Sequence, residues 1–140
     1  MQIYTELNLG KTDPGLREPD VTFDITKATE KARLIETLGF DGVVSTETKD
    51  DSYIMMALAA EATTTLQVAT SVAIAFARAP YTTAMAAWRL QALSRGRFTL
   101  GLGPQVKAHI VRRFGIPFTP AGPWMRDYIG AVRAFWDCWQ

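Results

Sequence analysis

The stretch Arg95–His109, R-G-R-F-T-L-G-L-G-P-Q-V-K-A-H, decides the fold expected for this chain. Gly96 ends a helical pattern, and residues 97–103 have the composition of a short buried strand. Residues 101–104, G-L-G-P, then predict a tight turn before a second helical run. A strand that ends in small residues before a helix leaves backbone N–H groups free at the edge of a sheet. In α/β proteins ligands bind at this edge, although an ordinary strand-to-helix turn gives the same pattern.

Length and composition indicate one globular domain over residues 1–140, with 48% hydrophobic and 21% charged residues. Fifteen basic and fourteen acidic residues give a formal net charge of +1, with no block of like charge to attract nucleic acid or a membrane surface. The single cysteine, Cys138, excludes an internal disulfide, and no apolar run is long enough to span a bilayer. The N-terminus lacks the pattern of a secretion signal, so we expect a cytoplasmic protein.

Strand and helix patterns alternate along the chain. The expected strands are residues 3–9, 40–47, 66–76 and 97–103, and the expected helices are residues 25–38, 52–63, 81–93, 106–114 and 125–139. Spacings of about 25 to 40 residues between strands predict a parallel sheet with right-handed crossovers. Four such units are half of an eight-stranded barrel. The predicted fold class is therefore α/β, a parallel (βα)4 half of a TIM barrel.

Local signals set the ends of several of these elements. Asp24 and Asp51 are predicted N-caps, Gly39 is a predicted helix stop, and Pro80 is expected near the start of a helix. The polar stretch Lys11–Asp20 is predicted to be a loop, either a cover for a site or a variable surface loop.

A half-barrel on its own exposes two sheet edges and an unfilled inner face. The chain is therefore a fragment, one half that pairs with another half, or a small open sheet.

Several motifs resemble the luciferase-like monooxygenase superfamily. The longest are A-T-S-V-A-I-A-F-A-R-A-P (Ala69–Pro80), W-R-L-Q-A-L-S-R-G-R-F-T-L-G-L-G (Trp88–Gly103) and Q-V-K-A-H-I-V-R-R-F-G (Gln105–Gly115). L-G-F-D-G-V-V (Leu38–Val44) and A-L-A-A-E (Ala57–Glu61) extend the likeness to nearly the whole chain. The chain looks most similar to the branch that uses the deazaflavin coenzyme F-420. Members are eight-stranded barrels, commonly dimeric, that bind a flavin or deazaflavin at the C-terminal mouth, and this sequence resembles their N-terminal half.

The resemblance implies a cofactor site. In relatives, a cis peptide bond without proline supports the back of the tricyclic ring, and it falls at Ser71–Val72. Residues after it flank the ring, and the turn after strand four meets the coenzyme. The implied cofactor-binding residues are Ser71, Val72, Ala73, Ile74, Gly103, Pro104 and Gln105, with His109 a little further along the next helix. The implied cofactor is coenzyme F-420, with FMN as the alternative.

Glu47 is the implied catalytic residue, because deazaflavin relatives often place an aspartate against the ring there. A carboxylate could hydrogen-bond the ring or tune a proton transfer. A hydrogen bond to a neighbouring loop is the alternative role. Thr48 and Val106 stand where sugar-phosphate-oxidising relatives carry a histidine base and a glutamate acid, so that reaction is disfavoured.

Other candidates have ordinary structural explanations. His109 fits a solvated helix position as well as a ligand, and Cys138 is expected to be a packed thiol. The aromatic residues of the last helix have the spacing of a core rather than of a ring-stacking box; they are Trp124, Tyr128, Phe135 and Trp136. No cluster of cysteine and histidine suggests a metal.

The leading hypothesis is an oxidoreductase that transfers a hydride between coenzyme F-420 or a flavin and a small organic substrate. In relatives the phosphate-binding loops lie in the second half of the barrel. Coenzyme binding would therefore need a homo-oligomer or a complementary half-barrel chain. The alternative is a truncated, non-catalytic homologue that serves as an association module through its exposed sheet edges.

Overall fold

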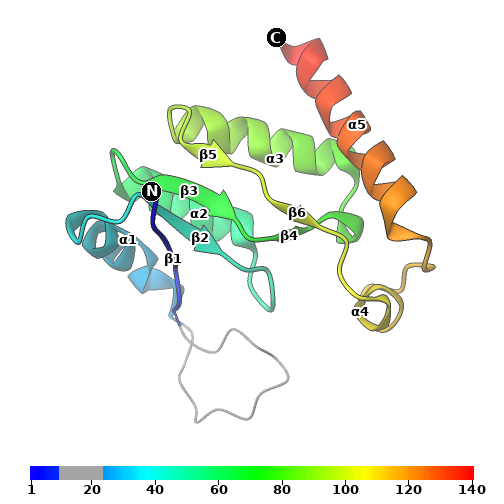
Figure 1. Ribbon diagram of the computed structural model, residues 1–140, viewed down its shortest axis with the longest axis horizontal. Coiled ribbons are helices and arrows are strands. Elements are labelled where there is room, and N and C mark those ends of the chain that lie inside the picture. The colour runs from blue at the N-terminus through cyan, green and yellow to red at the C-terminus, as the bar shows by residue number, and fades with distance from the viewer. Residues whose placement is uncertain (10–23) are drawn as a thin grey trace.

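The computed structural model describes residues 1–9 and 24–140 (Figure 1). Its elements, in chain order, are β1 (Tyr4–Glu6), η1 (Ile25–Lys27), α1 (Ala28–Thr37), β2 (Gly42–Ser45), α2 (Ser52–Ala62), β3 (Gln67–Thr70), β4 (Ala73–Ile74), η2 (Ala75–Ala77), α3 (Pro80–Leu93), β5 (Phe98–Thr99), β6 (Leu102–Gly103), α4 (Lys107–Arg112) and α5 (Ala121–Trp139). The loop predicted at Lys11–Asp20 lies outside the described residues.

The strands form a parallel sheet in the order β1-β2-β3-β5, which is their order along the chain. β4 and β6 form a second parallel pair that continues β3 and β5 toward their carboxyl ends. Each helical connection therefore leads to a neighbouring parallel strand, as in a barrel of repeated βα units. The predicted α/β class with parallel (βα)4 order is confirmed.

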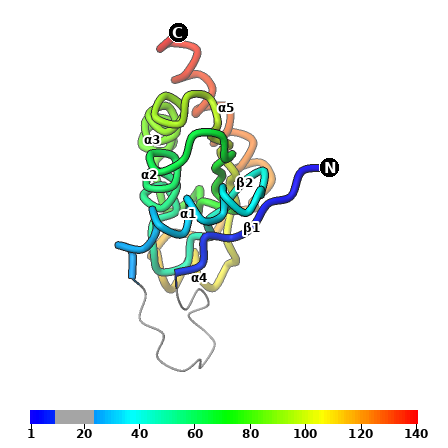
Figure 2. The backbone as a smooth tube through the Cα atoms, turned by 90° about the vertical axis from the view of Figure 1, so that its left-hand side faces the viewer, coloured from blue at the N-terminus to red at the C-terminus, as the bar shows by residue number. Residues whose placement is uncertain are grey.

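Helices α1, α2 and α3 lie in one layer along one side of the sheet (Figure 2). Val43 and Val68 pair in register and are fully buried under this layer, together with Met56 of the alanine-rich α2. Val44 and Ala69, which alternate to the opposite face, are only half-buried. The sheet is thus closed by helices on one face and partly open on the other.

The predicted end signals act as expected. Asp24 accepts a hydrogen bond from the Thr26 amide at 3.1 Å, and Asp51 accepts one from the Tyr53 amide at 2.8 Å. Gly39 has a φ of 82°, which suits a residue just after a helix. Pro80 is the first residue of α3. An N–H group at this position has no partner within the helix, so proline, which lacks one, fits there.

Several elements differ from prediction in their bounds, and strand one is shorter, spanning Tyr4–Glu6 instead of residues 3–9. Strand three is interrupted between β3 and β4 at Ser71–Val72, and strand four is interrupted at residues 100–101. Helix α5 begins at Ala121 instead of 125, because Pro123 falls in its first turn, where proline is tolerated.

Helix α5 attaches to α3 through a second core. Phe76 stacks on Trp124 with ring centroids 3.7 Å apart, and Tyr128 is 3% exposed. Trp136 donates from Nε1 to the Ala84 carbonyl at 3.0 Å. The aromatic residues of α5 therefore pack as core, as their spacing predicts. Cys138 does not: it is exposed on the outer face of α5, so the prediction of a packed thiol is wrong.

Every helix among the described residues is too short or too polar to span a bilayer. Within the same residues, no group of histidine, cysteine and acidic side chains could hold a metal ion.

Candidate functional site

The carboxyl ends of strands two, three and four meet at one edge of the sheet. Glu47 follows β2, and its Oε2 accepts a hydrogen bond from the Ile74 amide of β4 at 2.7 Å. Ile74 in turn pairs in register with Gly103 of β6. The structure therefore brings together the three segments that the sequence predicted to form a site.

The peptide bond between Ser71 and Val72 is cis, as the family resemblance implies. Main-chain bonds hold this segment on both sides. The Ser71 amide donates to the Ser45 carbonyl at 2.8 Å, and the Ala73 amide donates to the Gly101 carbonyl at 2.8 Å. The segment is thus fixed between strands two and four.

At this edge Ser71 and Val72 are exposed, whereas Ala73, Ile74 and Gly103 are buried. The Val72 side chain is 44% exposed, which is unusual for a large apolar residue beside a core. A Cβ at Gly103 would lie 2.4 Å from Val72 Cγ2, so only glycine allows this approach without a shift. Val72 packed over Gly103 thus forms a small apolar platform at the edge of the sheet.

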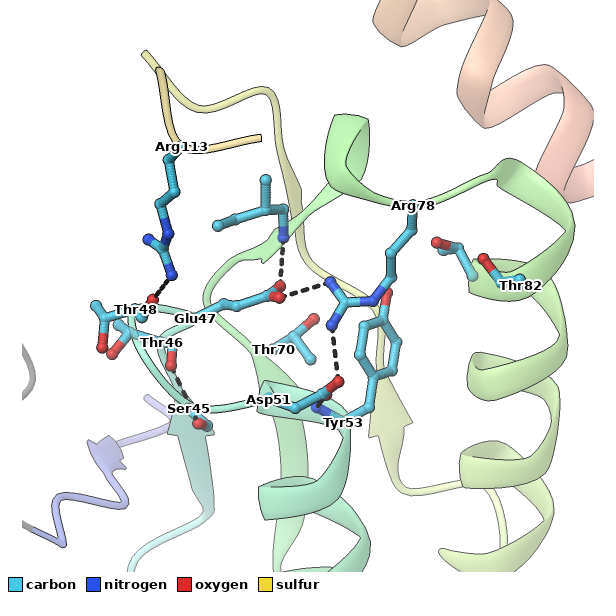
Figure 3. Close-up of polar contacts among 12 residues, drawn as sticks. Ser45, Thr46, Glu47, Thr48, Asp51, Tyr53, Thr70, Arg78, Thr82 and Arg113 are labelled. Carbon is cyan, nitrogen blue, oxygen red and sulfur yellow. Dashed lines mark hydrogen bonds and ion pairs between the residues drawn. The ribbon is translucent and has the colours of Figure 1, made fainter. Parts of the chain in front are cut away.

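Both carboxylate oxygens of Glu47 are occupied (Figure 3). Oε1 accepts from Arg78 Nη1 at 2.6 Å, while Arg78 Nη2 donates to Asp51 Oδ2 at 2.8 Å. The Glu47 side chain is 12% exposed. Glu47 therefore has the loop contact considered as its alternative role, and a part in catalysis stays a prediction.

The guanidinium of Arg78 is the centre of this cluster. It lies 4.9 Å from the centroid of the Tyr53 ring. Burial lowers the pKa of Arg78, but the hydrogen bonds and charges of Glu47 and Asp51 outweigh it, so the pKa is raised and the cation is stabilised. Burial also raises the pKa of Tyr53 to about 12, so its phenol stays neutral.

The remaining predicted residues follow β6. Pro104 and Gln105 are half-buried in the turn, and Gln105 has a φ of 66°, uncommon for a residue other than glycine. The Gln105 Oε1 accepts from the Val106 amide at 2.9 Å, which turns the side chain onto its own backbone.

His109 lies on α4, whose C-terminal end is held near the Glu47 loop. Arg113 points toward this loop and donates a hydrogen bond to the Thr48 carbonyl (Figure 3). The Nδ1 atom of His109 is buried and has no hydrogen-bond partner. Over residues 1–9 and 24–140, no hydrogen bond or ion pair joins His109 to Glu47.

Arg78 and Asp51 had no functional role in the sequence prediction. The sequence offered one sign of a role for Arg78: it follows the least polar run of the chain, residues 66–76, where an unpaired charge is unfavourable. Its partners are 31 and 27 residues away, so the pattern alone did not identify them.

A groove of about 590 Å³ lies elsewhere, between β5 and helices α3 and α5. Its walls include Trp88, Phe98, Leu102, Val132 and Trp136. None of the predicted site residues lines it. The groove runs along the side of β5 that has no neighbouring strand within the described part of the chain.

Comparison with known sequences gives matches over nearly the whole chain. Residues 6–138 match the family described as luciferase-like monooxygenase. An uncharacterised protein of Mycobacterium tuberculosis is 40% identical over 116 residues, which are 83% of this chain and 34% of that protein. A candidate coenzyme F-420-dependent oxidoreductase of the same species is 36% identical over 102 residues, 72% of this chain and 29% of that protein. The chain thus spans about a third of the length of these curated relatives.

Two solved structures share the fold. Monooxygenase RslO1 from Streptomyces bottropensis superposes with a TM-score of 0.81 at 22% identity, covering 97% of this chain and 43% of that one. The oxygenating constituent of 3,6-diketocamphane monooxygenase from Pseudomonas putida, solved in complex with FMN, gives 0.78 at 16% identity, covering 97% and 40%.

Proposed function

Because the chain belongs to the luciferase-like monooxygenase family, we propose that it forms one side of an oxidoreductase site for coenzyme F-420 or FMN. The proposed reaction is hydride transfer between this cofactor and a small organic substrate. The observation that carries the proposal is the exposed side chain of Val72, packed over the buried Gly103, at the sheet edge where parallel α/β proteins bind ligands.

The residues present suit a flat cofactor. Ser71 and Val72 are exposed at the strand ends, and a Cβ at residue 103 would displace the Val72 side chain. The turn at Pro104 and Gln105 follows β6, and the unpartnered Nδ1 of His109 on α4 is a further polar group near this turn in sequence. When bound, a flavin or deazaflavin supplies the hydride chemistry, and the protein supplies orientation and electrostatics.

In this proposal Glu47 contributes through orientation. Its two oxygens hold the Ile74 amide and Arg78, so it fixes the strand that carries the platform. A direct proton-transfer role for Glu47 would require one of these bonds to open.

The choice of cofactor stays between two candidates. Coenzyme F-420 is supported by the relative at 36% identity, whose name is that of a coenzyme F-420-dependent oxidoreductase. FMN is the alternative, suggested by the ligand of a structure that shares the fold at 16% identity.

We also propose that a second chain completes the site, either another copy or a complementary half-barrel, in the cytoplasm. Within the described residues, β1 and β5 each pair on one side only. Ile3 and Tyr4 at the β1 edge are 50% and 42% exposed, and the apolar groove lies beside β5. These unpaired edges also favour the second candidate function, an association module without catalysis.

Titration with FMN and with coenzyme F-420, followed by ring fluorescence at high protein concentration, tests the proposal. We expect a saturable change with one cofactor and its loss in Val72→Glu, which puts a charge on the platform. Leu34→Glu is the matched control, because Leu34 is 56% exposed on α1, away from this edge. Absence of binding by both cofactors to an associated, folded chain would favour the association module.

A further inference from the structure

A side chain completes the hydrogen bonding of strand three at the edge of the sheet. The main-chain ladder between β2 and β3 ends near Ser45, whose carbonyl accepts from the Ser71 amide. Three residues later, the Ile74 amide donates to Glu47 Oε2 at 2.7 Å instead of to a main-chain oxygen. Ile74 is 3% exposed, so without this bond its amide would be buried and unpaired.

Arg78 holds the carboxylate that makes this bond. Its Nη1 binds the other oxygen of Glu47 at 2.6 Å, and its Nη2 binds Asp51 at 2.8 Å. Asp51 also caps α2 by accepting from the Tyr53 amide. One planar guanidinium therefore ties the loop after β2 to the start of α2 and to the chain that follows η2.

The charges make Arg78 hard to replace. Two carboxylates, Glu47 and Asp51, converge on this single cation, which also lies over the Tyr53 ring. A neutral side chain at residue 78 would leave the two anions without compensation, and Glu47 would gain by turning toward water. A lysine ammonium is a point charge and does not present two parallel donors to two acceptors.

We propose that Arg78 is a positioning residue: through Glu47 it fixes the Ile74 backbone and so the strand segment that forms the cofactor surface. The link to the cofactor rests on the proposed function. The contacts from Arg78 through Glu47 to the Ile74 amide, here called the clamp, are present in the chain without a ligand. While Arg78 is in place, they keep Glu47 bound to the Ile74 amide.

Hydrogen exchange of the Ile74 amide, measured by NMR, tests the clamp without any ligand. In Arg78→Gln we expect exchange to quicken by about tenfold or more, because a buried hydrogen bond to a charged group is lost. Arg78→Lys should give an intermediate rate. The Val68 amide, which donates to the Arg97 carbonyl at 3.0 Å, should keep its rate. Arg89→Gln, an exposed position of α3, is the matched control.

A double-mutant cycle then shows whether Arg78 acts through Glu47. Adding Arg78→Gln to Glu47→Gln should change the Ile74 rate little beyond Glu47→Gln alone. Unchanged Ile74 exchange in Arg78→Gln, or fully additive effects in the double variant, would overturn the proposal. If Arg78→Gln does not give a folded spectrum, the same cycle is run with Arg78→Lys.

Cofactor titration of the same variants separates this inference from the proposed function. Where the wild-type chain binds FMN or coenzyme F-420, Arg78→Gln should weaken binding and Arg89→Gln should not; equal affinities would contradict the link to the cofactor surface. Where the wild-type chain binds neither, the proposed function fails, and the exchange cycle still decides whether the clamp exists.

Discussion

The Nη2 atom of Arg97, the residue before β5, donates to the Ala60 carbonyl near the end of α2 at 2.9 Å. The same guanidinium donates to the Leu66 carbonyl at 2.5 Å and to both the carbonyl and the hydroxyl of Thr63. The last carbonyls of a helix have no partner within the helix. Arg97 therefore caps α2 and fixes the start of β3 beside β5.

Replacement of Arg97 by methionine should destabilise the fold by about 2 to 3 kcal/mol, because several buried carbonyls lose their donor together. Arg97→Lys should lose less, since an ammonium still reaches part of the set. Urea unfolding followed by circular dichroism measures both. Arg95→Met, at the neighbouring exposed position with a φ of 55°, is the control. An equal loss of unfolding free energy in Arg95→Met and Arg97→Met would show that the hydrogen bonds of Arg97 do not stabilise the fold.

Glu36 predicts a pH dependence of stability. Its Oε1 accepts from the amides of Thr64, Thr65 and Leu66, at 2.9, 2.7 and 3.0 Å. Burial raises the pKa of Glu36, but these bonds outweigh it and the pKa is lowered from 4.5. The folded state therefore favours the carboxylate.

This stabilisation should be fully present above about pH 4.5, the unfolded value, and should be lost as the pH falls through the lowered folded pKa. The difference between the urea midpoints of wild type and Glu36→Gln should therefore be smaller at pH 3 than at pH 7. We expect Glu36 to change the free energy of unfolding only modestly, because its carboxylate is largely solvated and its charge is screened. An equal difference in urea midpoint at pH 7 and pH 3 would contradict a stabilising role for the Glu36 carboxylate.

Thr83 and Tyr53 should respond differently to loss of a hydroxyl. Thr83 Oγ1 lies 2.6 Å from the hydroxyl of Tyr128, and both residues are buried. The Tyr53 hydroxyl is buried with no hydrogen-bond partner. Thr83→Val would leave Tyr128 unpaired and should cost about 1 to 3 kcal/mol, whereas Tyr53→Phe removes an unsatisfied group and should cost less. Thermal unfolding of the two variants checks the order, and a larger loss in Tyr53→Phe would refute it.

The parts of the fold that depend on local signals were predictable. Caps at Asp24 and Asp51, the helix stop at Gly39 and the alternation of strands with helices all act within a few residues. The family resemblance added the segment at Ser71–Val72. These together predicted the strand order and the segments that meet at the candidate site.

The contacts that hold the site were not predictable in the same way. Arg78, Arg97 and Glu36 each bind groups 27 to 37 residues away. A single sequence shows such residues only as charges near apolar runs, with no sign of their partners. The exposure of Cys138 was missed for a related reason: aromatic neighbours in sequence lie on other faces of α5.

Substitution by alanine should cost more stability at Gly101 than at Gly103, the two glycines of strand four. A Cβ at Gly101 would lie 2.1 Å from the Thr70 carbonyl oxygen, which belongs to the sheet backbone and cannot move freely. A Cβ at Gly103 would lie 2.4 Å from the exposed Val72 side chain. Overpacking of this kind costs about 1 to 3 kcal/mol, and the Gly101→Ala variant should be at the upper end or beyond.

Truncation of Val72 separates the two cases. Val72→Ala removes the methyl group that a Cβ at residue 103 would meet, so it should restore stability to Gly103→Ala but leave Gly101→Ala unchanged. Urea unfolding of the two single alanine variants, with and without Val72→Ala, gives the coupling energies. Rescue of both glycine sites, or of neither, would mean that Val72 does not make the close contact with Gly103 that forms the platform.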